Sequence, residues 1–286
     1  MTGAQARRMA DNLDRISPRN FKALAALITA KVGIKLPASK QTMLEGRLRR
    51  RIMVTGHASI DDYCADLLSG AAGAEELGNL INAVTTNKTD FFREPAHFDY
   101  LASTILPGFR DDGRTRIRCW SAAASTGAEA YTLAMVCDDF YQRHRAPDYE
   151  IIATDIDTNV LATGIRAIYP TEQVAPVPPE LRRRYVLEPK QAGRGEVRIC
   201  GTLRRKVGFG QLNLMDRNYP LGAPLDIILC RNVLIYFERD IQRAVIGRMF
   251  DRLRPGGFLI LGHSESLGDF DGALEQVASN VFMKKA

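Results

Sequence analysis

The chain has 286 residues, of which 45% are hydrophobic and 25% are charged, and its formal net charge is +6. These values are ordinary for a soluble globular protein and exclude a disordered chain, and the longest apolar runs are too short to cross a bilayer. The length suits two domains, and an N-terminus without the apolar core of a signal peptide predicts a cytoplasmic protein without membrane insertion.

Cysteine and histidine residues are dispersed along the sequence. The five cysteines form no C-x-x-C pair, which predicts reduced thiols and no disulfide framework. The four histidines are equally scattered and no zinc-type spacing is present, so we expect no metal site.

Positive charge is concentrated in two regions. Residues 1–85 contain 12 basic and 8 acidic residues, and residues 181–206 contain 9 basic and 2 acidic residues. Such regions suggest an acidic partner, which could be nucleic acid, a membrane surface or an acidic protein.

The first third of the chain has the punctuation of helices. Ser17 followed by Pro18 is a helix start, Gly33 is a helix end, and Ser39 and Ser59 can each cap a further helix. The predicted helices cover residues 18–33, 39–56, 59–68 and about 74–84. We therefore expect a helical domain at residues 1–85.

After Pro95 the pattern alternates between strand and helix. "RIRCWSA", "YEIIATDID", "PLDIILCRN" and "RPGGFLILGHSES" read as strands, and the helices lie between them. This alternation predicts a doubly wound, mainly parallel sheet at residues 86–286, with ligands bound at the carboxyl ends of the strands. The short runs "EVRIC" and "KVGFG" predict a small antiparallel β-insertion at about residues 181–211.

Two features at strand ends suggest a ligand. The small-residue loop "AASTGAEA" would let a ligand approach backbone N–H groups, and it is neither a G-x-G-x-x-G fingerprint nor a P-loop. Asp155 ends the second strand, where a carboxylate can accept both ribose hydroxyls. Together they favour a nucleoside without phosphates, S-adenosylmethionine, over NAD or ATP. The alternatives are a tight turn without a ligand, and Asp155 or Asp157 as a helix cap.

A third feature is "LCRNVLIYF", in which Arg231 and Asn232 directly follow a buried strand. Polar residues at that point of a parallel sheet face the ligand crevice. The alternative is that Asn232 simply serves the turn.

These segments carry a family resemblance. "TTNKTDFFRE", "WSAAASTGAEAYTLAM", "ATDID", "LCRNVLIYF" and "LRPGGFLILGHSESL" occur in this order. Together they resemble the CheR family of chemotaxis receptor methyltransferases over almost the whole chain. The resemblance implies an α/β fold, in which a small helical domain precedes an S-adenosylmethionine-dependent methyltransferase domain with a β-insertion. It also implies methyl transfer to glutamate side chains of the cytoplasmic helical region of chemoreceptors, and a receptor C-terminal tail could dock at the β-insertion.

The resemblance also implies site residues. "TTNKTDFFRE", residues 85–94, would be a strap over the cofactor, anchored by Phe91 and Phe92. Arg93 and Tyr236 match residues beside the reacting methyl group. The positions that match cofactor contacts are Asn87, Thr89, Arg93, Glu129, Asp155, Asn213, Leu214, Arg231 and Asn232. The alternative for the strap is an interdomain linker with a buried Phe pair.

The expected chemistry needs no general base. A glutamate has a pKa of about 4.3 and is already a nucleophilic anion at neutral pH. We therefore expect alignment of the carboxylate in a dry pocket, with Arg93 as its contact, to dominate catalysis.

The predicted helix at residues 39–56 places basic and apolar side chains on adjacent faces. Arg47, Arg50 and Arg51 fall on one arc, so we expect them to bind a glutamate-rich receptor helix. The alternative is a solvated basic face.

Two rival functions are compatible with these features. The basic regions would suit a nucleic-acid methyltransferase, but no Asn/Asp-Pro-Pro-Tyr/Phe motif is present and "CRNV" stands in its place. A binding module that senses S-adenosylmethionine without catalysis is the other. We expect no nucleic-acid partner, and the sequence leaves the oligomeric state open.

Overall fold

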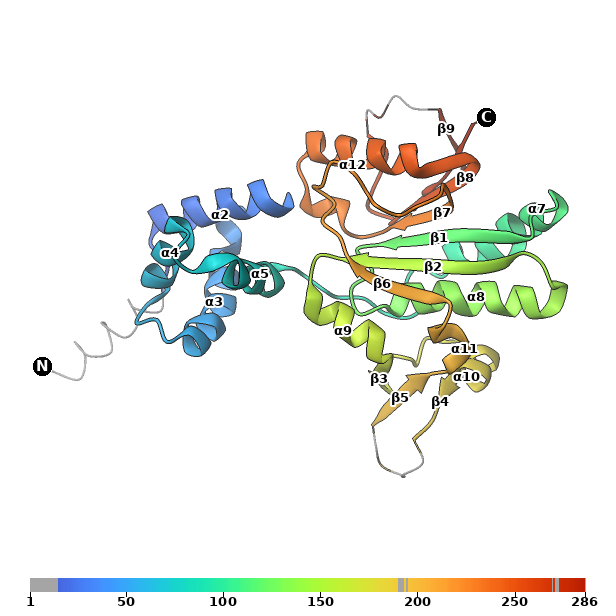
Figure 1. Ribbon diagram of the computed structural model, residues 1–286, viewed down its shortest axis with the longest axis horizontal. Helices are drawn as coiled ribbons and strands as arrows, with labels where there is room; N and C mark the ends of the chain where they lie inside the picture. Colours follow the sequence, from blue (N-terminus) through green and yellow to red (C-terminus); the bar gives the residue numbers. More distant parts are fainter. Residues whose placement is uncertain (1–14, 190–192, 194, 269, 271–272, 286) are drawn as a thin grey trace, which may run out of the picture. The chain divides into compact units, whose positions relative to one another are not determined.

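The computed structural model describes residues 15–189, 193, 195–268, 270 and 273–285 (Figure 1). These residues form two compact units. The helical unit contains the described residues up to Thr86 together with Tyr236–Glu238, and the sheet unit contains those of Asn87–Ile235 and Arg239–Ala286. Residues 1–14, and with them part of the first basic region, lie outside the described residues, as do Lys190 and Arg194 of the second. Within the described part of the chain, no helix has both the length and the apolarity to cross a membrane.

The helical unit follows the cap residues of the sequence, with one exception. Its helices are α2 (Pro18–Val32), the 3-10 helix η1 (Ala38–Lys40), α3 (Gln41–Thr55), α4 (Ile60–Ser69) and α5 (Gly73–Val84). The Ser17 side chain accepts a hydrogen bond from the backbone N–H of Asn20, and Ser59 caps α4 in the same way. The prediction that Ser39 caps the second helix is wrong. Ser39 lies inside η1, and this tight turn delays the start of α3 to Gln41.

The sheet unit contains one large and one small sheet. Its helical segments are α6 (Ala96–Tyr100), the π-helical η2 (Leu101–Ile105), α7 (Leu106–Asp111), α8 (Ala128–His144), α9 (Thr158–Arg166), α10 (Pro179–Tyr185), α11 (Gly201–Arg204) and α12 (Arg239–Arg252). The 3-10 helix η3 (Leu234–Tyr236) begins in this unit, and its last residue, Tyr236, belongs to the helical unit. Its strands are β1 (Arg116–Ala122), β2 (Asp148–Asp155), β3 (Ile168–Pro170), β4 (Val186–Leu187), β5 (Glu196–Ile199), β6 (Val207–Gln211), β7 (Leu225–Cys230), β8 (Leu253–Leu261), β9 (Leu274–Ala278) and β10 (Val281–Lys284).

The large sheet has the strand order β6-β2-β1-β7-β8-β10-β9. The first five strands are parallel, and β10 and β9 add an antiparallel edge. From the β1–β7 pair, chain order runs outward through β2 to β6 on one side and to β8 on the other, and Ala122 pairs with both Thr154 and Cys230. The carboxyl ends of β1, β2 and β7 therefore meet where the strand order reverses, which is where parallel sheets bind ligands. The expected α/β fold with a mainly parallel sheet is confirmed.

The small sheet has the order β3-β5-β4 and is antiparallel, as expected for the insertion. Its composition differs from the prediction. The run "KVGFG" was expected in the insertion, but it forms β6 and pairs in parallel with β2, from Ile151 with Val207 to Asp155 with Gln211. The third strand of the small sheet comes instead from β3. Glycines in β6 obscure its apolar pattern, and parallel pairing with a distant strand leaves no local signal in the sequence.

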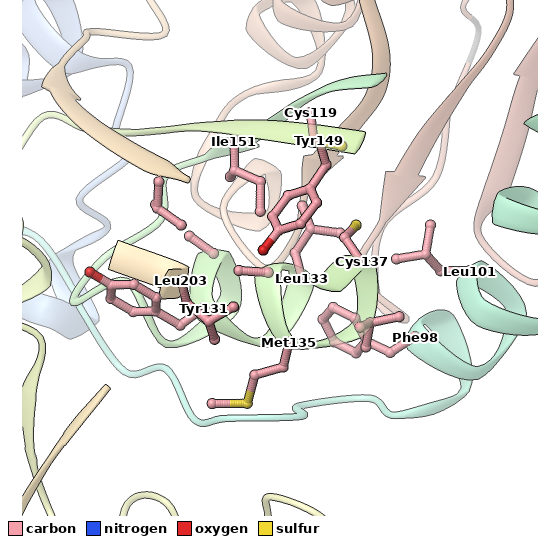
Figure 2. Packing of buried hydrophobic residues seen from close by; sticks show 14 of the residues in the cluster. Phe98, Leu101, Cys119, Tyr131, Leu133, Met135, Cys137, Tyr149, Ile151 and Leu203 are labelled. Carbon is pink, nitrogen blue, oxygen red and sulfur yellow. The ribbon is translucent and has the colours of Figure 1, made fainter. Parts of the chain in front are cut away.

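A buried cluster joins α8 to the sheet. Leu133 and Cys137 of α8 pack with Cys119 of β1 and Ile151 of β2 (Figure 2). Right-handed crossovers from β1 to β2 and from β7 to β8 run in opposite directions, so α8 and α12 cover opposite faces of the sheet. Burial on both faces explains why β7 is apolar at five of its six positions, with Asp226 as the exception.

Candidate functional site

The loop after β1 and the turn after β7 carry an unusual share of strained backbone. Eight non-glycine residues with positive φ occur in the described chain, and five of them lie in these two connections or in the strap. These five are Phe92, Glu94, Ala123, Ser125 and Asn232. Each such residue raises the free energy of the fold unless its surroundings hold it, and clusters of them mark functional sites.

Asp155 holds the loop after β1. Its Oδ2 accepts a hydrogen bond from the backbone N–H of Ser125 at 2.8 Å, and its Oδ1 accepts one from the N–H of Asp157 at 3.0 Å. Burial raises the pKa of Asp155, although these backbone donors partly offset the effect. The alternative that an aspartate caps α9 also holds, because the Asp157 side chain accepts from the N–H of Asn159.

The strap, from Asn87 onward, is tied to the same loop. The Asn87 side chain donates to Oδ2 of Asp157 at 2.6 Å, and its carbonyl accepts from the Ser125 hydroxyl at 2.8 Å. Phe91 is fully buried and meets the ring of Tyr169 edge-on at 5.0 Å between centroids. These contacts fix the strap beside the carboxyl ends of β1 and β2.

Arg231 joins the far end of the strap to α8. Its guanidinium donates to Oε2 of Glu129 at 2.9 Å, to Oε2 of Glu94 at 2.9 Å and to the carbonyl of Arg93 at 2.5 Å. Its side chain is 1% exposed and lies over the ring of Phe98. Because a buried guanidinium requires paired charge, this lock ties the backbone of the strap to the end of β7.

Glu265 holds the turn after β7. Its buried carboxylate accepts backbone hydrogen bonds from Gly262, Asn232, Val233 and Leu234, at 2.7–2.8 Å. Burial raises its pKa, and the four donors partly offset the effect. A Cβ at position 262 would lie 2.8 Å from Oε2 of Glu265, so this close approach requires glycine.

The pKa values of Glu94 and His97 are both lowered, which keeps the first charged and the second neutral at pH 7. Burial alone would raise the pKa of Glu94, but the hydrogen bond from Asn232 and the charge of Arg231 lower it. Burial, followed by the charge of Arg231, lowers the pKa of His97 to about 4. At neutral pH Glu94 is therefore an anion and the His97 imidazole is uncharged.

Comparison with known proteins identifies the chain. Residues 87–283 match the family model described as the CheR methyltransferase, SAM binding domain, and residues 19–85 match the CheR methyltransferase, all-alpha domain. The chain belongs to the CheR methyltransferase family. It is 38% identical to the chemotaxis protein methyltransferase of Klebsiella aerogenes, with 93% of this chain and 89% of that protein covered.

Two further relatives give the same picture. The chain is 35% identical to chemotaxis protein methyltransferase 2 of Pseudomonas aeruginosa, with 92% of both proteins covered. It is 36% identical to the chemotaxis protein methyltransferase of Escherichia coli, with 90% of this chain and 87% of that protein covered. The predicted family is thus confirmed, and so is S-adenosylmethionine as the cofactor of its sheet unit.

The site of this CheR family member fits that cofactor. The loop after β1 carries only small side chains, and in it the buried Oγ1 of Thr126 makes no hydrogen bond within the described residues. Asp155 lies at the adjacent strand end, and the backbone N–H groups of Ser125 and Asp157 leave acceptor positions open on its carboxylate. Both features suit a nucleoside with ribose hydroxyls and without phosphates.

The nine positions expected at the cofactor all belong to the sheet unit. Asn87 and Glu129 contact Asp157 and Arg231, as described above. Asn213 and Leu214 follow β6, and the N–H of the preceding Leu212 donates to the Asp155 carbonyl at 3.0 Å. The Thr89 carbonyl accepts from Gln173. The fold therefore gathers these positions around the carboxyl ends of β1, β2, β6 and β7, while their contacts with the cofactor stay predictions.

The remaining predicted residues are in the helical unit. The Tyr236 carbonyl accepts from the N–H of Lys35 at 2.9 Å. Arg47 donates to the carbonyls of Val84 and Thr85, and burial lowers its pKa. Arg51 forms a two-point ion pair with Glu76 at 2.6 and 3.0 Å. Arg50 is exposed.

Two residues of the site escaped the sequence reasoning. Glu94 and Glu265 lie within the family-like segments, and the sequence predicts no role for them, although each makes several hydrogen bonds that shape the site. A glutamate directly after Arg93 and another in "GHSES" after a predicted strand were the available signals. Neither signal is specific, because what distinguishes these carboxylates is their burial.

Proposed function

We propose that this chain transfers a methyl group from S-adenosylmethionine to glutamate side chains of chemoreceptors, also called methyl-accepting chemotaxis proteins. The products are glutamate methyl esters and S-adenosylhomocysteine, and the role is adaptation in chemotaxis signalling. The match to both CheR domains and the names of the curated relatives support this proposal.

The Arg231 lock on the strap carries the proposal structurally. It fixes the backbone of Arg93 and the carboxylate of Glu94, whereas Arg93 itself is only partly buried. Among the residues that the structure describes, the Arg93 guanidinium makes one hydrogen bond, to the carbonyl of Lys88 at 3.1 Å. A cation on a rigid backbone can bind and orient an incoming carboxylate without being neutralised by an acidic neighbour.

The proposed chemistry needs orientation and dryness. When bound, S-adenosylmethionine supplies an electrophilic methyl group on a sulfonium centre. The substrate glutamate is an anion at neutral pH, so no proton has to be removed before its oxygen attacks. Arg93 and Tyr236 would orient the carboxylate, and exclusion of water would strengthen the contacts that hold it.

Two surfaces support a receptor partner. On α3, Arg50 is exposed, while Arg47 and Arg51 are engaged within the helical unit, so we propose Arg50 as the main basic contact of the Arg47, Arg50 and Arg51 set. In the small sheet, β3 and β4 are edge strands. An edge strand can pair with an added strand, which supports docking of a receptor C-terminal tail there.

A labelling experiment tests the proposal against its two rivals. The protein is incubated with cofactor labelled in the methyl group, together with either receptor-containing membranes or nucleic acid. We expect label in receptors and its release as methanol by mild base, because esters are base-labile and methylated amines are not. Receptors with alanine at the accepting glutamates should stay unlabelled. Base-stable label in nucleic acid, or cofactor binding without transfer to receptors, would overturn the proposal.

A further inference from the structure

Three side chains that lie far apart in the sequence form a potential metal-binding cluster in the sheet unit. Glu94, His97 and His263 each offer one ligand atom, and these atoms all lie within 4.8 Å of one another. The two rings meet edge-on with centroids 5.0 Å apart, and Nδ1 of His97 is 3.6 Å from Oε2 of Glu94. The expectation that the histidines are unclustered is therefore wrong for this pair.

His97 is poorly satisfied by the protein itself. Its side chain is 3% exposed, and neither ring nitrogen has a hydrogen-bond partner of normal geometry among the described residues. The backbone of Ser279 raises the pKa of His97, but its effect on that pKa is smaller than those of burial, Arg231, Glu94 and His263. Buried polar groups of this kind are normally paired, so an orphaned imidazole facing a carboxylate and a second imidazole points to a missing ligand.

The donor atoms of the cluster determine which cation it suits. Glu94 and Glu129 both contact Arg231, which leaves this group of three with a net charge of −1 beside the neutral His97. Two imidazoles and one carboxylate are the donor set of borderline transition metals, whereas Mg²⁺ and Ca²⁺ prefer oxygen donors alone. We propose that Glu94, His97 and His263 bind a divalent transition-metal ion such as Zn²⁺.

Metal binding at this cluster would act on the cofactor site. Both oxygens of Glu94 already accept hydrogen bonds, from Asn232, Arg231 and the N–H of His263. A metal ion on Glu94 competes with these donors and loosens the Arg231 lock on the strap. Because coupling between two sites is reciprocal, the metal ion weakens cofactor binding and the cofactor weakens metal binding. The site is thus inhibitory.

The test measures metal binding directly, without receptor. All proteins carry Cys200→Ser, because Cys200 is the one partly exposed thiol. Calorimetry with Zn²⁺ should give one site, and Co²⁺ should give a visible absorption band. The exposed His263→Ala should weaken Zn²⁺ binding about tenfold or more, whereas His144→Ala, an exposed histidine on the same unit, should have no effect.

The second readout is cofactor affinity. Zn²⁺ near its Kd for the control should lower the affinity for S-adenosylhomocysteine in His144→Ala and leave it nearly unchanged in His263→Ala, which binds little Zn²⁺ at that concentration. No Zn²⁺ binding at 1 mM, or equal Zn²⁺ binding by the two variants, would overturn the site. Tight Zn²⁺ binding with unchanged cofactor affinity would overturn the inhibitory coupling. Neither result bears on methyl transfer, which is measured separately with receptor.

Discussion

The loop after β1 and the turn after β7 both hold strained backbone with a buried carboxylate, but the two carboxylates differ in how many acceptor positions they have left. Each contains strained residues at the carboxyl end of a strand, and each is held by one buried carboxylate. Asp155 accepts from Ser125 and Asp157 and keeps acceptor capacity, whereas four backbone N–H groups saturate Glu265. The comparison indicates that Asp155 has acceptor capacity left for a ligand, while Glu265 only holds the backbone of its turn.

The largest expected effect is the loss of stability caused by Glu265→Gln. Each carboxylate oxygen of Glu265 accepts from two backbone N–H groups, so Glu265→Gln turns an amide N–H₂ toward two of the four donors. We therefore expect a loss of about 3 kcal/mol or more in the free energy of unfolding. Urea denaturation measures it. Glu275→Gln, on an exposed glutamate of β9 that is paired at 3.8 Å with Lys285, should change stability by less than about 0.5 kcal/mol. If both variants unfold like the wild type, the saturated carboxylate does not hold the turn.

Asp155→Ala should separate affinity from stability. We expect cofactor affinity to fall by about 1–3 kcal/mol, the usual range for a buried polar contact left unpaired. Calorimetry with S-adenosylhomocysteine measures the affinity, and urea denaturation of the free protein measures the stability. Unchanged affinity with lowered stability would remove the difference between the two carboxylates.

Arg93 of the strap and Tyr236 of η3 are the two catalytic candidates to compare. Arg93→Ala should lower kcat about 10- to 100-fold, because a charge-assisted contact is lost, and Tyr236→Phe should lower it only about 2- to 10-fold, because the ring is kept. Both should change cofactor affinity less than kcat. Initial rates with receptor give kcat, and calorimetry gives affinity. A larger defect in Tyr236→Phe would reverse the proposed roles.

Of Arg47, Arg50 and Arg51 on α3, Arg50 should behave as a pure surface contact. Arg50→Glu should raise the KM for receptor several-fold at low salt, with cofactor affinity and stability unchanged. The effect should shrink as salt screens exposed charges. Lys22→Glu, an exposed charge reversal on α2, is the matched control. Arg51→Glu should also lower stability, because it leaves Glu76 unpaired. Equal KM values for Arg50→Glu and Lys22→Glu would indicate a solvated face.

The smallest expected effect is that of pH. The rate of the wild type should stay nearly flat between pH 6 and pH 8, because the substrate glutamate is already ionised and no general base is proposed. The pKa of His97 is lowered to about 4, so this imidazole stays uncharged across that window. Rates with saturating receptor and cofactor measure the profile. A single ionisation near pH 7 that disappears in His263→Gln would contradict the mechanism without a base.

The sequence identified the site where its signals are local. Asp155 directly ends an apolar strand, and Arg231 and Asn232 directly follow another, so their place at the carboxyl edge followed from strand alternation. The five ordered segments were specific enough to indicate the family. Helix caps such as Ser17 and Ser59 could also be predicted from the sequence, since a cap binds N–H groups two or three residues away.

Tertiary structure decided whatever depends on distant partners. The glycine-rich β6 became a central-sheet strand only through pairing with β2, and Ser39 lost its cap role to a tight turn. Glu94, His97 and His263 have no shared motif, but the ends of the strap and of β8 bring them together. Glu265 reads in sequence as an ordinary glutamate, and only burial against four backbone donors gives it a role. Sequence spacing records neighbours along the chain, whereas burial and pairing depend on which segments the sheet places side by side.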